Sequence, residues 1–196
     1  VQRVLRVYEV ELKFDLKDDE SVVKRLENMA VCFRDSMEQI DRYFAHPIRN
    51  FAQTDEALRL RQVGDEVEVT WKGPRVDTST KVRQEIELGV MPQGPTGQTT
   101  VAAWTELLEA LGFHQVFEVV KTRIPGRVHW HGSDVEGAID TVADLGCFAE
   151  FEIIAGEGEV PLARDCVESL ARELGLKNPE SASYLELLLS KQEAPR

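Results

Sequence analysis

Three charged residues at alternate positions near the amino end could act together on one ligand. The segment from Tyr8 to Phe14 alternates apolar residues with Glu9, Glu11 and Lys13. In a strand, this alternation places the apolar side chains on one face and the three charges in a row on the other. Neighbours in the row would lie about 6.5 to 7 Å apart, far enough to bind a ligand between them. Such a row is also common on the solvent face of a half-buried strand, so its recurrence elsewhere decides how it is interpreted.

The same alternation recurs along the chain. It is found in segments 57–63, 66–72, 81–88, 113–127 and 148–153, each of which fits a strand with charges on one face. The charges offered by all these strands are Glu9, Glu11, Lys13, Arg59, Arg61, Lys72, Arg83, Glu85, Glu87, Lys121, Arg123, Glu150 and Glu152. If the sheet closes into a barrel whose apolar face packs outward against helices, all of them face the lumen.

A lumen lined by so many charges is poorly solvated without a ligand. Arginine and lysine suit phosphate oxygens, and arginine can bind them through two parallel hydrogen bonds. Clustered glutamates suit Mg²⁺ or Mn²⁺, hard cations that also bridge phosphates. The pattern therefore predicts a metal-bound polyphosphate in the lumen. A salt-bridged solvent face is the alternative.

Four helices are predicted to cover this sheet. The first follows the candidate N-caps Asp18 and Asp19 and repeats apolar residues at helical spacing. The others are expected from Thr99 or Thr100 to Leu111, from Pro161 to Leu174, and at about 181–190. Segments 48–56 and 91–99 have the character of loops, and Gly64-Asp65 is a hairpin turn signal.

Residues 128–154 fit two structures. Ser133 to Glu136 resembles a capping box, and Ile139, Val142 and Leu145 follow at helical spacing, which favours a helix. The alternative is a hairpin, with a strand at 138–142, a turn at Leu145-Gly146 and a returning strand at 148–153. The pattern alone leaves both open.

Composition limits the function classes. The 196 residues include 23 Lys plus Arg against 35 Asp plus Glu, a net charge of −12, which argues against nonspecific binding to nucleic acid or to anionic membranes. The three cysteines are widely spaced, which favours a reduced compartment. No apolar run has the length of a membrane span, so we expect a cytoplasmic protein.

The order of the charged segments resembles the CYTH superfamily, which includes class IV adenylyl cyclases and inorganic or thiamine triphosphatases. The resemblance covers roughly residues 5 to 190. It rests on Glu9-x-Glu11-x-Lys13 followed in order by the motifs at 41–44, 58–61, 70–74, 83–87, 121–123, 140–152 and 183–184. It implies an α+β fold, an eight-stranded antiparallel β-barrel with helices packed outside that forms a triphosphate tunnel, and it favours the hairpin at 128–154. From the length of the chain we expect one domain over 1–191, with 192–196 as a disordered tail.

The resemblance further implies roles for individual residues. The metal-binding carboxylates would be Glu9, Glu11, Glu150 and Glu152, with Asp140, Glu85 and Glu87 as further candidates, and the cofactor would be Mg²⁺ or Mn²⁺, as two ions. The triphosphate clamp would be Arg59, Arg61, Lys72, Arg83, Lys121 and Arg123. Lys13 and Tyr43 are the catalytic candidates.

Within the superfamily, the stretch from Tyr43 to Arg61 most resembles the class IV adenylyl cyclase branch, whose reaction makes cyclic AMP and pyrophosphate from ATP. His46 lies in this stretch, as a turn residue or a substrate contact. The alternatives are a triphosphatase that releases orthophosphate and a noncatalytic polyphosphate- or nucleotide-binding module. The expected partner is a nucleoside triphosphate or another triphosphate, and the protein would be a monomer or a homodimer.

Overall fold

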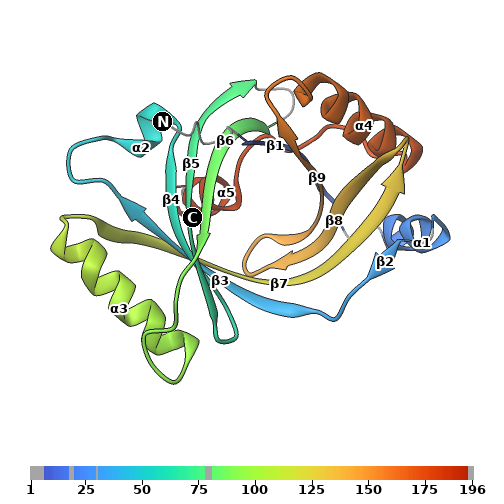
Figure 1. Cartoon of the computed structure of the whole chain (residues 1–196). Helices are drawn as coiled ribbons and strands as arrows, with labels where there is room; N and C mark the ends of the chain where they lie inside the picture. Colours follow the sequence, from blue (N-terminus) through green and yellow to red (C-terminus); the bar gives the residue numbers. More distant parts are fainter. Residues whose placement is uncertain (1–6, 18–19, 30, 78–80, 194–196) are drawn as a thin grey trace.

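Eight antiparallel strands close into a barrel in the computed structural model, which describes residues 7–17, 20–29, 31–77 and 81–193 (Figure 1). Around the barrel the order is β7, β3, β4, β5, β6, β1, β9 and β8, and β8 pairs with β7 to close it. A short strand, β2, pairs with β7 outside this ring. The predicted eight-stranded barrel and α+β class are confirmed.

Most predicted strands are present, but two bounds were wrong: β5 continues through Gly73-Pro74-Arg75, where a break was predicted, to Asp77, and β8 begins at Ser133 instead of residue 138. The strands are β1 Val7–Asp15, β2 Cys32–Phe33, β3 Met37–Ala45, β4 Ala57–Val63, β5 Glu66–Asp77, β6 Lys81–Gly89, β7 His114–Trp130, β8 Ser133–Val142 and β9 Gly146–Gly156. The turn between β4 and β5 is the predicted one, and Gly64 in it has a φ of +57°, a conformation that glycine adopts without steric cost.

The helices are α1 Glu20–Asn28, α2 Phe51–Thr54, α3 Gly97–Ala110, α4 Val160–Glu173 and α5 Tyr184–Glu193. Helix α2 falls where the sequence indicated a loop, and the Asn50 side chain caps it by accepting from two backbone N–H groups. Helix α5 extends to Glu193, into the predicted disordered tail. The candidate N-caps Asp18 and Asp19 lie outside the described residues. Within the described ranges, no helix has both the length and the apolar composition that crossing a membrane requires.

The hairpin is the observed structure of segment 128–154. Ile139 is paired with Ile124 of β7 on one side and with Ala149 of β9 on the other. These long-range pairings override the local helical spacing. At Gly126 of β7 the chain packs closely, since a Cβ there would lie 2.8 Å from the Val31 side chain, beside the point where β2 pairs.

Apolar side chains on the outer wall of the barrel form two cores. Val10, Leu12 and Phe14 of β1 pack with Leu26 of α1 and Leu170 of α4 in the larger core. A smaller core joins the wall at β4 and β5 to α3. Fully burying one such side chain contributes about 1.5–3 kcal/mol to folding. The apolar face therefore points outward, as predicted, and the alternate positions of β1 point into the lumen.

Helix α5 occupies the opening of the barrel (Figure 1). Its Tyr184 and Leu188 pack against Val119, Val142 and Phe148 on β7, β8 and β9. Val119 is paired with Asp41 and Phe148 with Asp140, so these apolar residues share the lumen face with charged ones. The carboxyl-terminal helix thus contributes to the wall of the lumen.

Candidate active site

The lumen contains a cavity of about 870 Å³, within the usual range for small-molecule sites. Every residue predicted for the site lines it except Asp140. Those lining residues are Glu9, Glu11, Lys13, Tyr43, Arg59, Arg61, Lys72, Arg83, Glu85, Glu87, Lys121, Arg123, Glu150 and Glu152. Each of these side chains was predicted from the alternation within one strand. In the structure they lie together, from seven strands, in one cavity.

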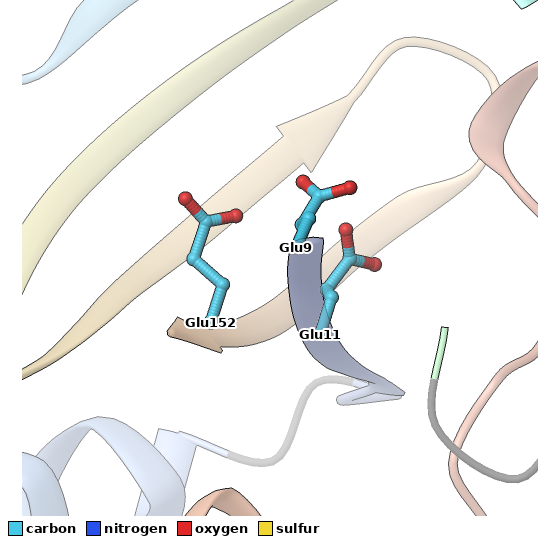
Figure 2. Close-up of side chains that lie close together, drawn as sticks. All are labelled: Glu9, Glu11 and Glu152. Atoms are coloured by element: carbon cyan, nitrogen blue, oxygen red, sulfur yellow. The ribbon is translucent and has the colours of Figure 1, made fainter. Parts of the chain in front are cut away.

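Three carboxylates in the cavity are close enough to share one cation (Figure 2). Glu9 and Glu11 lie on β1, Glu152 lies opposite Glu11 on β9, and one oxygen of each lies within 4.8 Å of the others. Burial and the charges of Glu9 and Glu11 raise the pKa of the Glu152 carboxyl to about 8. Three oxygen ligands this close suit a hard divalent cation, whose charge would remove the repulsion among them.

Lys72 connects this acidic cluster to the neighbouring wall. Its Nζ donates to both carboxylate oxygens of Glu9, at 2.9 and 2.7 Å, and lies 3.3 Å from Glu85. Burial lowers the pKa of Lys72, but the carboxylates of Glu9 and Glu85 outweigh it, so the pKa is raised and the ammonium stays charged. Lys72 therefore holds the positive charge nearest to the acidic cluster among the ion pairs described.

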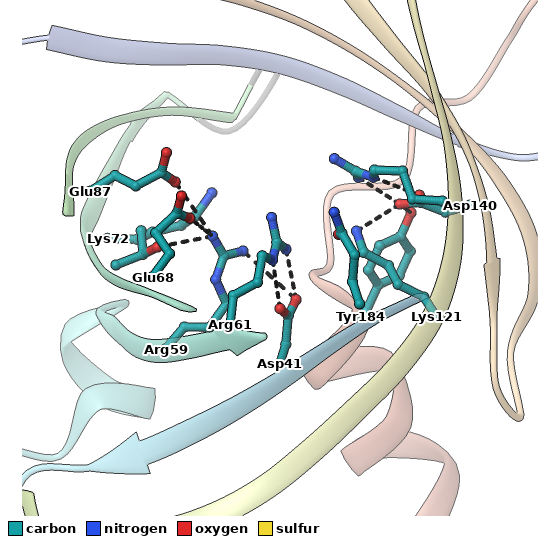
Figure 3. Close-up of polar contacts among 12 residues, drawn as sticks. Asp41, Arg59, Arg61, Glu68, Lys72, Glu87, Lys121, Asp140 and Tyr184 are labelled. Carbon is teal, nitrogen blue, oxygen red and sulfur yellow. Dashed lines mark hydrogen bonds and ion pairs between the residues drawn. The ribbon is translucent and has the colours of Figure 1, made fainter. Parts of the chain in front are cut away.

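Asp41 holds two arginines in place on the opposite wall (Figure 3). Arg61 donates to it through Nε at 2.6 Å and Nη2 at 2.7 Å, and Arg59 lies at 3.8 Å. Burial raises the pKa of Asp41, but Arg59 and Arg61 outweigh it and hold the pKa well below its usual range. Arg59 also donates to Thr70 at 3.0 Å and lies 3.7 Å from Glu87. The two guanidinium groups are thus fixed before any ligand arrives.

Asp140 is completely buried and forms a second centre of this kind (Figure 3). It accepts from Lys121 at 2.8 Å, from Arg123 at 2.7 and 2.6 Å, and from the Tyr184 hydroxyl at 3.0 Å. The resemblance implied a metal ligand here, but Asp140 lies outside the group of carboxylates that could share a cation. Its hydrogen bonds come from two cations and a phenol, and its role as a metal ligand stays a prediction.

The two cations beside Asp140 differ in their surroundings. Arg123 also pairs with Glu150, the metal-ligand candidate that lies nearest to it. Burial, followed by the charge of Arg123, lowers the pKa of Lys121 to about 8. Glu150 is therefore engaged by Arg123, whereas Glu152 belongs to the acidic cluster, and the metal-binding role of Glu150 stays a prediction.

Lys13 and Tyr43 both line the cavity. Lys13 is 1% exposed, donates to the carbonyl of Ala182, and its Nζ lies 4.1 Å from the centre of the Tyr184 ring, a cation–π contact. Burial and the charge of Asp41 raise the pKa of Tyr43, so its phenol is neutral at pH 7.

Sequence reasoning missed several residues that shape the site. Glu68 is absent from the charges predicted to face the lumen, and it lies 4.0 Å from Arg59. Burial, followed by a hydrogen bond and repulsion from Glu87, raises the pKa of Glu68 to about 7. Tyr184 was part of a motif without a role. Its contact with Asp140 spans 44 residues, which no local pattern could signal.

A family model for the CYTH domain matches residues 7–184. The chain belongs to the CYTH family. It is 35% identical over 144 residues, 74% of this chain and 75% of the other, to the protein named "Putative adenylate cyclase MJ0240" from Methanocaldococcus jannaschii.

Solved structures share the fold. The PH1819 protein of Pyrococcus horikoshii is 39% identical, with a TM-score of 0.79 over 93% of this chain and 99% of that one. A Hippeastrum structure, described as a "putative adenylyl cyclase" with a dominant triphosphatase activity, is 17% identical. Its TM-score is 0.63 over 96% of this chain and 98% of that one, a likeness of fold alone.

Proposed function

We propose that this CYTH protein is a class IV-type adenylyl cyclase that converts ATP to cyclic AMP and pyrophosphate with divalent metal ions. One observation carries the proposal: the carboxylates of Glu9, Glu11 and Glu152 lie within 4.8 Å of one another in the same cavity as a set of buried cations. A triphosphate with a bound metal ion matches both groups, because the metal ion would bind the carboxylates and the phosphates would bind the cations.

The cations would bind the triphosphate by exchanging partners. Without ligand, Arg59 and Arg61 share the carboxylate of Asp41, and Arg123 is paired with Asp140 and Glu150. These aspartates orient each guanidinium but leave further N–H groups for phosphate oxygens, because a guanidinium has five donors. Preorganised donors in a buried site stabilise developing charge more strongly than donors in water.

The metal ions would be held by Glu9, Glu11 and Glu152, with Glu85 beside Glu9 through Lys72. When bound, divalent ions would lower the pKa of the ribose 3′-hydroxyl and offset charge on the leaving pyrophosphate. The chain's own part is to hold the α-phosphorus and the 3′-oxygen in line. Lys13 and Lys121, both buried in this wall, would place positive charge beside the phosphates.

A triphosphatase is the second candidate. The same clamp shifted by one phosphate would direct water at the terminal phosphorus, and orthophosphate would leave. The Hippeastrum structure gives this candidate its support, since that protein is described as a putative cyclase with dominant triphosphatase activity. The 35% identity to a protein named as a putative adenylate cyclase favours the cyclase for this chain.

Phosphorus NMR of the purified protein with ATP and Mg²⁺ or Mn²⁺ tests the proposal. Cyclic AMP with pyrophosphate is the expected product pair, and orthophosphate without cyclic AMP would refute the cyclase in favour of the triphosphatase. Glu152→Gln should abolish the metal-dependent reaction. The matched control is Glu38→Gln on β3, an exposed residue outside the cavity, which should react at the parent rate.

A further inference from the structure

Tyr184 belongs to a helix outside the barrel, but its side chain is part of the wall of the cavity. It is the first residue of α5, is 7% exposed and lines the cavity. Figure 3 shows it beside Lys121 and Asp140. The proposed reaction assigns no task to this side chain. Its contacts are nevertheless with charged groups of the cavity as well as with apolar residues.

The Tyr184 ring lies close to two buried ammonium groups. Nζ of Lys13 lies 4.1 Å and Nζ of Lys121 lies 5.1 Å from the ring centroid, and these lysines are 1% and 3% exposed. At such distances the negative face of an aromatic ring attracts a cation, most strongly where water is excluded. The lysines lie on β1 and β7, which β8 and β9 separate in the barrel. The ring therefore brings together two cations from strands that are not neighbours.

Two contacts fix the orientation of the ring. The Tyr184 hydroxyl donates to Asp140 at 3.0 Å, and Asp140 also accepts from Lys121. Burial, followed by the charges of Glu150 and Asp140, raises the pKa of the Tyr184 phenol, so at pH 7 it stays protonated and donates. The Phe148 ring packs edge-on against the Tyr184 ring at 5.1 Å.

The segment that leads into α5 makes further contacts with Lys13. The Lys13 ammonium donates to the carbonyl of Ala182, and the backbone carbonyl of Lys13 accepts from the N–H of Glu180 at 2.7 Å. A carbonyl and an aromatic ring both stabilise an ammonium, but neither carries a net charge. These two partners hold the Lys13 ammonium in place without cancelling its positive charge.

We infer that Tyr184 is a positioning residue for the triphosphate: its ring holds the ammonium groups of Lys13 and Lys121 where the phosphates would bind. The inference rests on the proposed function, and it applies to the cyclase and the triphosphatase alike, because both would bind phosphates in the same clamp. Tyr184 acts through the two lysines. A purely structural role is the alternative, since the ring also belongs to an apolar core that includes Val119 and Val142.

Calorimetric titration with tripolyphosphate in EDTA separates the two roles. Tyr184→Leu keeps an apolar side chain but removes both cation–π contacts, so it should weaken tripolyphosphate binding about tenfold. Tyr184→Phe keeps the ring and should bind within about threefold of the parent, because Asp140 keeps its bonds from Lys121 and Arg123. Leu188→Ala, the matched control, removes apolar area from the same core, so it should lower Tm and leave the affinity within about twofold of the parent.

Proton NMR of the lysine ε-methylene groups tests the ring contact itself and does not depend on how well Tyr184→Leu folds. An aromatic ring shifts the signals of protons over its face upfield. The parent and Tyr184→Phe should therefore both show upfield ε-methylene signals for Lys13 and Lys121, assigned by their loss in Lys13→Arg and Lys121→Arg.

Ordinary lysine ε-methylene signals in the parent would overturn the inference. Parent-like affinity of Tyr184→Leu would do the same, as would equal losses of affinity in Tyr184→Leu and Tyr184→Phe. In each of these cases the proposed function stands if the parent binds tripolyphosphate. A parent that binds neither tripolyphosphate nor ATP, with or without Mg²⁺, would refute the proposed function and the inference with it.

Discussion

Replacing Asp140 with asparagine should destabilise the protein strongly and in a way that a triphosphate reverses. The carboxylate is 0% exposed and accepts from Lys121, Arg123 and the Tyr184 hydroxyl. An asparagine of the same shape carries no charge, so Lys121 loses its ion pair with Asp140, and Arg123 keeps its ion pair with Glu150. Removing one partner of a buried ion pair costs about 3–5 kcal/mol.

That loss should be visible as a shift in melting temperature. For a chain of this size, 1 kcal/mol corresponds to roughly 2–4 °C, so Asp140→Asn should lower Tm by about 6 to 20 °C. Scanning calorimetry in EDTA measures the loss, and a repeat with saturating tripolyphosphate measures its recovery. The phosphates supply the negative charge that Asp140 provided, and a ligand at 100 times its Kd stabilises by about 2.7 kcal/mol.

The result separates two roles for Asp140. A metal ligand would leave the unfolding free energy of the metal-free protein unchanged on substitution, or raise it, and would weaken binding of Mg²⁺. If Asp140 instead positions Lys121 and Arg123, the substitution should lower the Tm of the metal-free protein by the amount given above. A metal-free Tm within about 2 °C of the parent, an effect below roughly 1 kcal/mol, would refute the reasoning.

Three further predictions concern the same cavity. Arg59→Ala should weaken triphosphate binding about tenfold to a hundredfold in calorimetry, since a hydrogen bond to a charged group contributes about 1.5–3 kcal/mol. The fold should be kept, because Arg61 stays paired with Asp41. An affinity near that of the parent would show that Arg59 is not part of the clamp. Because the folded-state pKa of Glu152 is about 8 and its ordinary value is 4.5, its contribution to the unfolding free energy of the metal-free protein is fully present below pH 4.5 and is lost as pH rises to 8. Urea denaturation across this range should show the decline in the parent but less of it in Glu152→Gln, and identical profiles would contradict the assignment. Arg75→Ala removes the hydrogen bonds from Arg75 to Asp55, Ser181 and Glu186. Amide hydrogen exchange should therefore become faster in α5 but not in β1. Unchanged exchange in α5 would show that apolar packing alone holds this helix in place.

The barrel and its charged lumen could be predicted because their signal is local. Alternation along β1, from Val10 outward to Glu11 inward, is a property of one strand, and a period of two fixes which side chains share a face. The hairpin at 133–156 could not be derived in this way, because Ile139, Val142 and Leu145 satisfy a helical period as well. Its pairing with β7 decides the structure, and only the resemblance to the family indicated that pairing.

The partners of each charge could not be predicted from local pattern. Asp140 faces Arg123 because of the register between β7 and β8, and it meets Tyr184 because α5 packs at the opening of the barrel. Both contacts join segments distant in sequence. The acidic cluster has the same origin, since Glu11 meets Glu152 across the β1–β9 pair. Sequence pattern thus identified the charged residues, whereas the fold separates the acidic cluster from the groups that position cations.

The location of the metal tests the central claim most directly. Crystals grown with Mn²⁺ and a nonhydrolysable ATP analogue can be measured at the manganese absorption edge, where anomalous difference density identifies the ion. We predict a peak among the carboxylates of Glu9, Glu11 and Glu152, with phosphate oxygens of the analogue between it and the arginines. Manganese found only outside the cavity, or an analogue bound without contact to Arg59, Arg61 or Arg123, would contradict the account.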